Sequence, residues 1–233
     1  MDLFYTNNML AENYILSKDE SKHCISVLRK KIKDKILITE GKGKIYSGEI
    51  IEIVNKQVRY KKLKVISNNH RKTKTHIAIS PTKNRVRFEW FLEKATEIGI
   101  DYIYPLICEN SERKKLNIER CQKILIAALK QSKSSILPKI TDMITFEKFL
   151  NNTHPQTTYI AHCYNTQKRK FYSILQNQKK TKITVLIGPE GDFSKREVEY
   201  AKNLKIEAIN ISDNILRTET AALIACHTIQ LTL

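Results

Sequence analysis

The sequence lacks the cysteine and histidine spacings that form metal sites and disulfide frameworks. It has five cysteines and six histidines, but no C-x-x-C motif and no H-x-x-x-H pair. An odd number of well-separated cysteines does not indicate a disulfide framework, and the missing pairs remove the usual zinc signatures. We therefore expect neither a metal site nor a disulfide scaffold.

Glycine and long hydrophobic runs are also scarce. None of the six glycines completes G-x-G-x-x-G, and no G-K-[S/T] triplet occurs, which excludes a Rossmann dinucleotide site and a P-loop. The longest apolar runs, near 185–187 and at 221–226, are too short to cross a bilayer. The first residues contain no basic segment followed by an apolar one. We expect no membrane partner, no secretory signal and a cytoplasmic location.

Positive charge is in large excess over negative charge. The 233 residues include 41 Lys and Arg against 24 Asp and Glu, a net charge of +17, and the excess is denser in the first 73 residues. Such a surface favours polyanionic partners, because it releases counterions condensed around phosphates. Abundant Lys, Asn and Ile also fit a drift towards A/T-rich codons, so charge alone leaves both interpretations open. The hydrophobic content of 41% is enough for a folded core.

Residues 1–70 are predicted to form a small β-rich domain. Strands rich in β-branched residues are expected at 35–39, 44–54 and 57–66. Glu40–Gly43 supplies a turn between the first two strands, and Ser17 with Glu20 has the spacing of a capping box for one helix. Short strands joined by tight turns are typical of a small β-barrel.

Residues 74–233 alternate between strand and helix patterns, and the polar stretch 67–74 is predicted to be the linker. Strands are expected at 77–80, 102–107, 157–161, 183–187 and 206–211. Helices are expected at 86–98, after Asn117, from Ser194 to about Leu204, and from about Thr218. This alternation implies an α/β domain with a mostly parallel sheet covered by helices.

Two strand-to-helix loops are the strongest candidates for a site. The buried strand 183–187 ends in Gly188-Pro189-Glu190-Gly191, and parallel sheets bind ligands at the carboxyl ends of their strands. The segment from Ile211 to Ala222 gathers polar residues where a helix begins and its N–H groups are free. Ordinary explanations stay open, namely a glycine-containing turn in the first loop, and a capping Thr218 with an Arg217–Glu219 surface pair in the second.

A basic strip, Arg113-Lys114-Lys115, is a candidate for phosphate contact, although a solvated loop is an equal alternative. Cations between Lys83 and Arg87, near another strand end, extend the same pattern. The sequence therefore indicates a nucleic-acid ligand without identifying it.

These segments together resemble one known family. The segments IGPEGDFS (187–194) and ILRTETAAL (215–223) look like the two C-terminal motifs of the bacterial 16S rRNA uracil-N3 methyltransferases, which belong to the SPOUT class. Three upstream segments, at 23–29, 93–99 with Pro105, and 127–132 with Pro138, are similar to other parts of that family. The resemblance covers essentially the whole chain.

The resemblance implies a fold, a reaction and partners. It implies an N-terminal PUA-like β-barrel that binds RNA, residues 1–70, followed by a SPOUT α/β domain, residues 74–233, with a mostly parallel sheet and a C-terminal trefoil knot. The implied activity is S-adenosyl-L-methionine-dependent methylation of N3 of a specific uridine in 16S rRNA of the small ribosomal subunit. Family members are homodimers with the cofactor pocket near the subunit interface.

The resemblance also implies site residues. Cofactor-binding residues would be Leu186, Ile187, Gly188, Pro189, Gly191, Ile211, Ser212, Ile215, Leu216 and Ala221. Arg217 is the candidate for stabilising negative charge on the uracil, and Glu190 or Glu219 for accepting its proton. RNA contacts are expected at His23, Arg29, Lys83, Arg85, Arg113, Lys114 and Lys115, with His23 and Arg29 equally able to brace the barrel.

The chain departs from the family pattern at Asp192 and Ser212, where the family often has glycine, and at Ser134 and Ile136, where it often has arginine. Two alternatives therefore stay open. One is a SPOUT methyltransferase acting on another RNA position or atom. The other is a non-catalytic RNA-binding protein of ribosome assembly.

Overall fold

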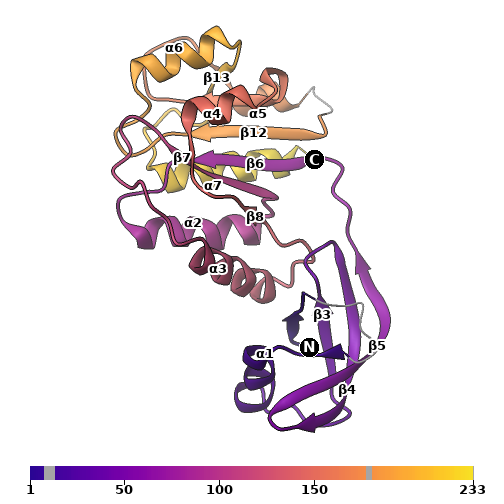
Figure 1. Cartoon of the computed structure of the whole chain (residues 1–233). Helices are drawn as coiled ribbons and strands as arrows, with labels where there is room; N and C mark the ends of the chain where they lie inside the picture. Colours follow the sequence, from indigo (N-terminus) through magenta and orange to yellow (C-terminus); the bar gives the residue numbers. More distant parts are fainter. Residues whose placement is uncertain (8–13, 177–179, 233) are drawn as a thin grey trace. The chain divides into compact units, whose positions relative to one another are not determined.

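The computed structural model describes residues 1–7, 14–176 and 180–232, and the chain divides into two compact units. Unit 1 comprises Met1–His70 and Ile126–Leu137, and unit 2 comprises Arg71–Leu125 and Pro138–Leu233 (Figure 1). The segment 126–137 groups with unit 1 because Leu129 packs in a buried cluster with Leu3 and Ile45. Each unit therefore has its own hydrophobic core.

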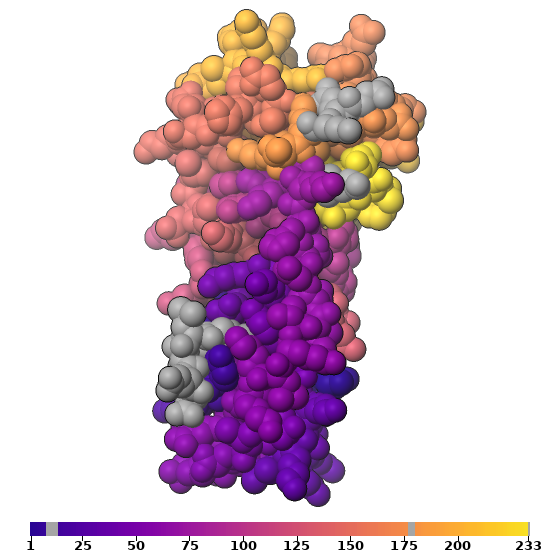
Figure 2. Space-filling view, turned by 90° about the vertical axis from the view of Figure 1, so that its right-hand side faces the viewer, coloured from indigo at the N-terminus to yellow at the C-terminus, as the bar shows by residue number. Residues whose placement is uncertain are grey.

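Unit 1 is built on a five-stranded sheet, in the order β1-β3-β4-β5-β2. Its strands are β1 (Leu3–Tyr5), β2 (Tyr14–Ile15), β3 (Lys35–Thr39), β4 (Lys44–Val54) and β5 (Gln57–Asn68). The strands predicted at 35–39 and 44–54 are confirmed, and β4 and β5 form a long antiparallel hairpin, whose purple surface is seen in Figure 2. Within the described residues the strand order is open, so no closed barrel is found.

One helical segment covers the core of unit 1. Helix α1 (Lys18–Lys22) begins after Ser17, whose hydroxyl accepts a hydrogen bond from the Glu20 N–H at 3.2 Å, and a π-helical turn, η1 (His23–Val27), continues it. The predicted N-cap at Ser17 is therefore confirmed, but the predicted capping box is not, because the Glu20 carboxylate pairs with Lys130 and does not bond back to the Ser17 backbone. The buried Glu20 carboxylate forms an ion pair of 2.6 Å with Lys130, which fastens the helix to the 126–137 segment of the same unit.

Unit 2 is built on a sheet with the order β11-β13-β10-β12-β6-β7-β8, in which all described pairs are parallel and β9 also pairs with β7. Its strands are β6 (Lys74–Ile79), β7 (Tyr102–Ile107), β8 (Lys139–Ile140), β9 (Ile144–Thr145), β10 (Thr158–Ala161), β11 (Arg169–Lys170), β12 (Lys182–Ile187) and β13 (Glu207–Asn210). The predicted parallel α/β sheet is confirmed. Because β10 lies between β12 and β13, the carboxyl ends of these three strands meet.

Helices cover both faces of this sheet (Figure 1). The helices of unit 2 are α2 (Arg85–Ile98), α4 (Phe146–Asn151), α5 (Phe171–Leu175), α6 (Lys195–Asn203) and α7 (Thr218–Leu231), with a 3-10 turn, η2 (Pro155–Thr157). Helix α3 (Ile118–Gln131) begins in unit 2, and its residues from Ile126 onwards group with unit 1. On one face, α4 and α6 pack on a buried cluster that includes Leu106, Ile160 and Leu186. On the other face, α7 packs on β6 and β12, and α2 and α5 contact α7.

The predicted linker at 67–74 is wrong at both ends. Strand β5 continues to Asn68, and β6 begins at Lys74, which pairs in register with Lys182 of β12. Pairing with a neighbouring strand has overridden the polar composition of this stretch. No helix in the described part of the chain is long and apolar enough to span a membrane. Across the same residues, no three His, Cys, Asp or Glu side chains group as a metal site would require.

Candidate functional site

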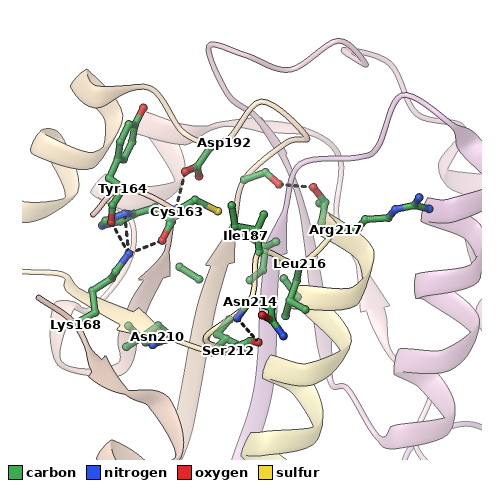
Figure 3. A pocket seen from close by; sticks show the side chains of 18 of the residues that line it. Cys163, Tyr164, Lys168, Ile187, Asp192, Asn210, Ser212, Asn214, Leu216 and Arg217 are labelled. Atoms are coloured by element: carbon green, nitrogen blue, oxygen red, sulfur yellow. Dashed lines mark hydrogen bonds between the residues drawn. The ribbon is translucent and has the colours of Figure 1, made fainter. Parts of the chain in front are cut away.

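A cavity of about 610 Å³ lies at the carboxyl ends of β10, β12 and β13. Three loops line it, namely 161–168 after β10, 187–192 after β12 and 209–218 before and at the start of α7 (Figure 3). The cavity therefore combines both candidate loops from the sequence with a third loop that follows β10. This is where an open parallel sheet places its ligands.

The loop after β12 is shaped by a close approach of backbone to backbone. A Cβ atom added to Gly188 would lie 3.0 Å from the Phe193 nitrogen and 3.1 Å from its ring, so only glycine fits without displacement. A Cβ on Gly191 would meet nothing nearer than 3.5 Å. The loop ends in a full capping box, in which Ser194 and Glu197 bond reciprocally, as the sequence predicts. Gly188 is thus the glycine on which the loop geometry depends.

Asp192 ties this loop to the loop after β10. Its backbone has a φ of 61°, and its carboxylate accepts hydrogen bonds from the Cys163 N–H at 2.7 Å and from the Phe193 N–H at 2.8 Å. These bonds give the residue a structural role at a position where the resembling family often has glycine. Ser212, the other departure in the cavity, accepts a hydrogen bond from the Asn214 N–H at 3.1 Å and stabilises its own turn.

The start of α7 is bonded to the loop that follows β12. Arg217 is the N-cap residue but makes no side-chain capping bond, and the Thr218 hydroxyl donates to the Gly188 carbonyl at 3.1 Å. The capping role considered for Thr218 is therefore wrong, because its hydroxyl bonds to β12's loop instead. The Arg217 side chain is exposed, extends away from Lys168 and Asp192 (Figure 3), and has no ion pair among the described residues.

Glu219 lies outside the cavity, although it is close in sequence. It is buried, its Oε1 lies 3.8 Å from the Arg87 Nε, and its Oε2 has no hydrogen-bond partner in the described structure. The considered Arg217–Glu219 pair is therefore wrong, because the helix turns Glu219 towards α2 while Arg217 remains at the cavity.

The loop after β10 was not identified from the sequence. The Lys168 ammonium donates to the carbonyls of His162 at 2.7 Å and Tyr164 at 2.8 Å, which closes the loop on itself. Burial lowers the pKa of His162 and of Lys168, and for His162 the neighbouring Lys168 charge adds to this effect. The available signal was the strand predicted at 157–161, because its carboxyl end must share the edge of the sheet with its parallel neighbours.

Glu190 lies at the rim of the cavity and connects it to the loop after β6. Its Oε1 accepts a hydrogen bond from the Lys83 N–H at 2.9 Å, while the Lys83 ammonium pairs with Glu112 at 2.7 Å. Arg113 donates to the carbonyls of Thr82 at 3.0 Å and Lys83 at 2.6 Å. Arg113 thus holds a loop in place, rather than presenting all its donors to a ligand.

The structure brings most of the predicted cofactor residues together. Those that line the cavity are Ile187, Gly188, Pro189, Ile211, Ser212, Ile215, Leu216 and Ala221, with Glu190 and Arg217 of the proposed reaction residues. Leu186 is buried in the core beneath it, and Gly191 lies beside Asn110, whose amide donates to its carbonyl at 3.2 Å. The place of each residue along its strand or loop therefore decides whether it faces the cavity.

The predicted RNA contacts fall into distinct groups. In unit 2, Lys114 and Lys115 are exposed, whereas Arg85 pairs with Glu89 at 3.2 Å on α2. In unit 1, His23 and Arg29 are exposed, and the His23 ring stands edge-on to Phe4 at 6.4 Å between centroids. No member of the predicted strip has an ion pair among the described residues, but Arg113 bonds to backbone carbonyls, so Lys114 and Lys115 are the members whose charged groups have no described partner.

Two protein families match the chain. The RNA methyltransferase domain matches residues 69–230, and the RNA methyltransferase PUA domain matches residues 16–60. The first match contains all three loops of the cavity.

Relatives that match over most of both chains are also rRNA methyltransferases by name. A ribosomal RNA small subunit methyltransferase E from Buchnera aphidicola subsp. Acyrthosiphon pisum is 30% identical, over 95% of this chain and 88% of its own length. A crystal structure of a "probable rRNA-methyltransferase" from Porphyromonas gingivalis is 33% identical with a TM-score of 0.90, over 99% of both chains. A ribosomal RNA small subunit methyltransferase E from Neisseria gonorrhoeae bound to S-adenosyl methionine has the same fold, at 24% identity and a TM-score of 0.87, over 99% of this chain and 97% of that one.

Proposed function

The chain belongs to the RNA methyltransferase family that includes ribosomal RNA small subunit methyltransferase E, and from that premise we propose that it methylates N3 of a specific uridine in 16S rRNA. The methyl donor is S-adenosyl-L-methionine, and the substrate is the small ribosomal subunit or its RNA in the cytoplasm. The observation that carries the proposal is the cavity at the ends of β10, β12 and β13, which is built from the two motifs that resemble this family.

The residues of the cavity fit this cofactor. Its volume of about 610 Å³ lies in the range of small-molecule sites, and apolar Ile187, Leu216 and Ala221 would cover the flat adenine ring. Gly188 keeps the loop free of a side chain, so that backbone groups can approach a ligand. When bound, S-adenosylmethionine supplies an electrophilic methyl group on a sulfonium.

Arg217 would stabilise the charge that develops during the reaction. Methyl transfer to N3 requires loss of the N3 proton, and negative charge then spreads onto the uracil carbonyl oxygens. A guanidinium brought against those oxygens stabilises that charge. The Arg217 side chain is exposed and has no ion pair within the described ranges, which leaves it available for this role.

Glu190 is favoured over Glu219 as the proton acceptor. Glu190 lines the cavity, and only one of its carboxylate oxygens is engaged by the Lys83 N–H, so it can accept a proton directly or through one water. Glu219 lies outside the cavity lining and faces Arg87. It would instead act as a positioning residue that connects the first turn of α7 to α2.

We further propose that residues 1–70 act as a PUA-like, barrel-like RNA-binding domain and residues 74–233 as the SPOUT domain. A C-terminal trefoil knot is supported by the chain path, because β13 lies beyond β10 whereas the following helix α7 returns to pack on β6 and β12. The proposed assembly is a homodimer.

Lys114 and Lys115 would contact RNA phosphates. Replacing both by alanine should weaken binding to small-subunit RNA and reduce the slope of log K against log salt by about 1.5, because two phosphate contacts are lost. Binding titrations over a range of salt concentrations measure this, with K195A/K202A on α6 as the matched double control. Parallel slopes for K114A/K115A and the wild type would exclude contact at this strip.

A methylation assay tests the reaction itself. The protein is mixed with labelled S-adenosylmethionine and unmethylated small subunits, and the labelled nucleoside is identified after digestion. We expect 3-methyluridine. Another methylated nucleoside would support the alternative of a SPOUT enzyme with a different target, and absence of both label and cofactor binding would support the non-catalytic RNA-binding alternative.

A further inference from the structure

A second cavity, of about 590 Å³, lies in unit 2 on the face of the sheet that α4 covers. Its walls come from residues 141–145, from α4 and the turn after it, from β7 and from the amino half of β12. Thr184 of this cavity and Ile187 of the first cavity are three residues apart, or about 10 Å along the strand.

One polar atom in the lining of this cavity, and one on the neighbouring strand, are buried and have no hydrogen-bond partner among the described residues. Thr184, which lines it, is fully buried, and its Oγ1 makes no hydrogen bond within the described structure. His76 is its register neighbour on β6, and the His76 Nε2 is likewise buried and unpaired among the described residues. An unsatisfied buried polar group costs about 1–3 kcal/mol, so two neighbouring ones point to a missing partner.

Aromatic rings contact one another beside these atoms. Tyr104 and Phe149 line the cavity with ring centroids 5.1 Å apart, and the Tyr104 hydroxyl bonds to the His76 Nδ1 at 3.2 Å. The His76 ring stacks on Tyr102 at 4.4 Å. Such rings are the surfaces on which proteins stack unpaired bases.

Cations surround the aromatic surface. Lys148 and Lys182 line the cavity, and neither has an ion pair among the described residues. Outside it, the ammonium groups of Lys74 and Lys139 lie over the Tyr102 ring, at 5.8 and 5.7 Å from its centroid. One carboxylate, Asp142, is in the lining. The excess of positive charge suits a phosphate.

We propose that this cavity binds a single unstacked nucleotide, with its base against Tyr104 and Phe149 and its phosphate near Lys182 and Lys148. Thr184 and His76 would supply hydrogen bonds to the base or the sugar. This proposal rests on the proposed function, because the nucleotide is taken to be part of the RNA substrate. Because the cavity is at the opposite half of β12 from the first one, its nucleotide is a neighbour of the methylated uridine and not the uridine itself.

The test is a titration of the full chain with uridine 5′-monophosphate, followed by calorimetry and by methyl NMR of Thr184 and Ile144. We expect saturable shifts at both methyl groups and tighter binding than for inorganic phosphate or uridine alone. Lys182→Met should weaken binding about tenfold and Thr184→Val about fivefold, while Lys195→Met on α6 leaves it unchanged. Thr184→Val removes an unsatisfied hydroxyl at nearly constant volume, so its Tm should not fall.

The outcomes separate this inference from the proposed function. An oligouridine that binds at least tenfold tighter than the mononucleotide identifies RNA as the source, and a preference for the free mononucleotide identifies a small ligand of the same chemistry. Shifts confined to the first cavity, or equal affinities for wild type, Lys182→Met and Thr184→Val, would overturn the second site. Failure of S-adenosylmethionine to bind the same samples would overturn the proposed function alone.

Discussion

The two halves of β12 differ in how their polar groups are satisfied. At the carboxyl end, side chains bond to backbone, as when Thr218 bonds to Gly188 and Asp192 to the Cys163 N–H. In the amino half, Thr184 and the neighbouring His76 carry buried polar atoms without a described partner. The first region is organised by its own hydrogen bonds, whereas the second has unused hydrogen-bonding capacity.

This difference indicates two kinds of site. Loops fixed by side-chain-to-backbone bonds hold their remaining backbone groups in place before a ligand arrives, which lowers the cost of ordering them on binding. A cavity with unpaired buried groups gains more from a ligand that pairs them. The following experiments probe the two halves, in decreasing order of expected effect.

Arg217→Ala should reduce methyl transfer the most. Loss of a cation that stabilises developing negative charge lowers the rate by roughly 100- to 1,000-fold. Single-turnover kinetics on small subunits measure the rate, and calorimetry with S-adenosylmethionine should give an affinity within about threefold of wild type. Arg196→Ala, at an exposed arginine of α6, is the control. Normal turnover of Arg217→Ala would exclude the proposed role.

Gly188→Ala should disrupt the loop at the carboxyl end of β12. The added methyl would lie 3.0 Å from the Phe193 nitrogen, and overpacking of this kind costs about 1–3 kcal/mol. We expect a lower Tm and cofactor affinity reduced by more than tenfold. Gly191→Ala is the matched control, because its methyl meets nothing nearer than 3.5 Å. Equal effects of the two exchanges would contradict the importance of the close approach.

Next to the amino half of β12, the buried His76 should make the stability of the fold decrease in acid. Burial, with the charges of Lys182 and Lys74, lowers the pKa of His76 from 6.5 to about 3. Below pH 6.5 the unfolded chain binds a proton that the folded chain does not, so stability present above pH 6.5 is lost as the pH falls towards 3. The loss from this group is at most about 1.4 kcal/mol per pH unit.

His76→Gln removes this proton uptake while keeping an acceptor for the Tyr104 hydroxyl. Urea unfolding at pH 7, 6, 5 and 4 should therefore give a shallower decline for this variant than for wild type. His70→Gln, at an exposed histidine, should decline like wild type. A decline of the same steepness in all three proteins would be evidence against a neutral, buried His76.

Substitutions of Asp192 should have the smallest effects, and alanine should weaken cofactor binding more than glycine. Asp192→Ala loses both hydrogen bonds and keeps a left-handed backbone that alanine disfavours, so we expect about tenfold weaker cofactor binding. Asp192→Gly loses the same bonds but tolerates the φ of 61°, so about threefold is expected. Calorimetry measures both. A glycine variant weaker than the alanine variant would contradict the role of backbone strain here.

The elements were predictable where a local pattern decided them. The capping box of Ser194 and Glu197, the cap at Ser17 and the strand at 44–54 follow from neighbouring residues and are confirmed. The linker predicted at 67–74 was too long at both ends, because β5 continues to Asn68 and the start of β6 at Lys74 is determined by its pairing with β12. The loop 161–168 went unrecognised because its residues carry no motif and reach the cavity only through strand order.

The sequence by itself determined the alternation of strands and helices, the family and the two glycine- and arginine-containing motifs, because each depends on residues close together in the chain. Only the tertiary structure decided which of those residues share a cavity, because strand order and helix rotation place Arg217 at the first cavity and turn Glu219 towards Arg87. It also decided that the register neighbours Thr184 and His76 each carry one buried polar atom, Oγ1 and Nε2, without a hydrogen-bond partner in the described structure. That arrangement depends on the register of two strands more than a hundred residues apart, which no local pattern encodes.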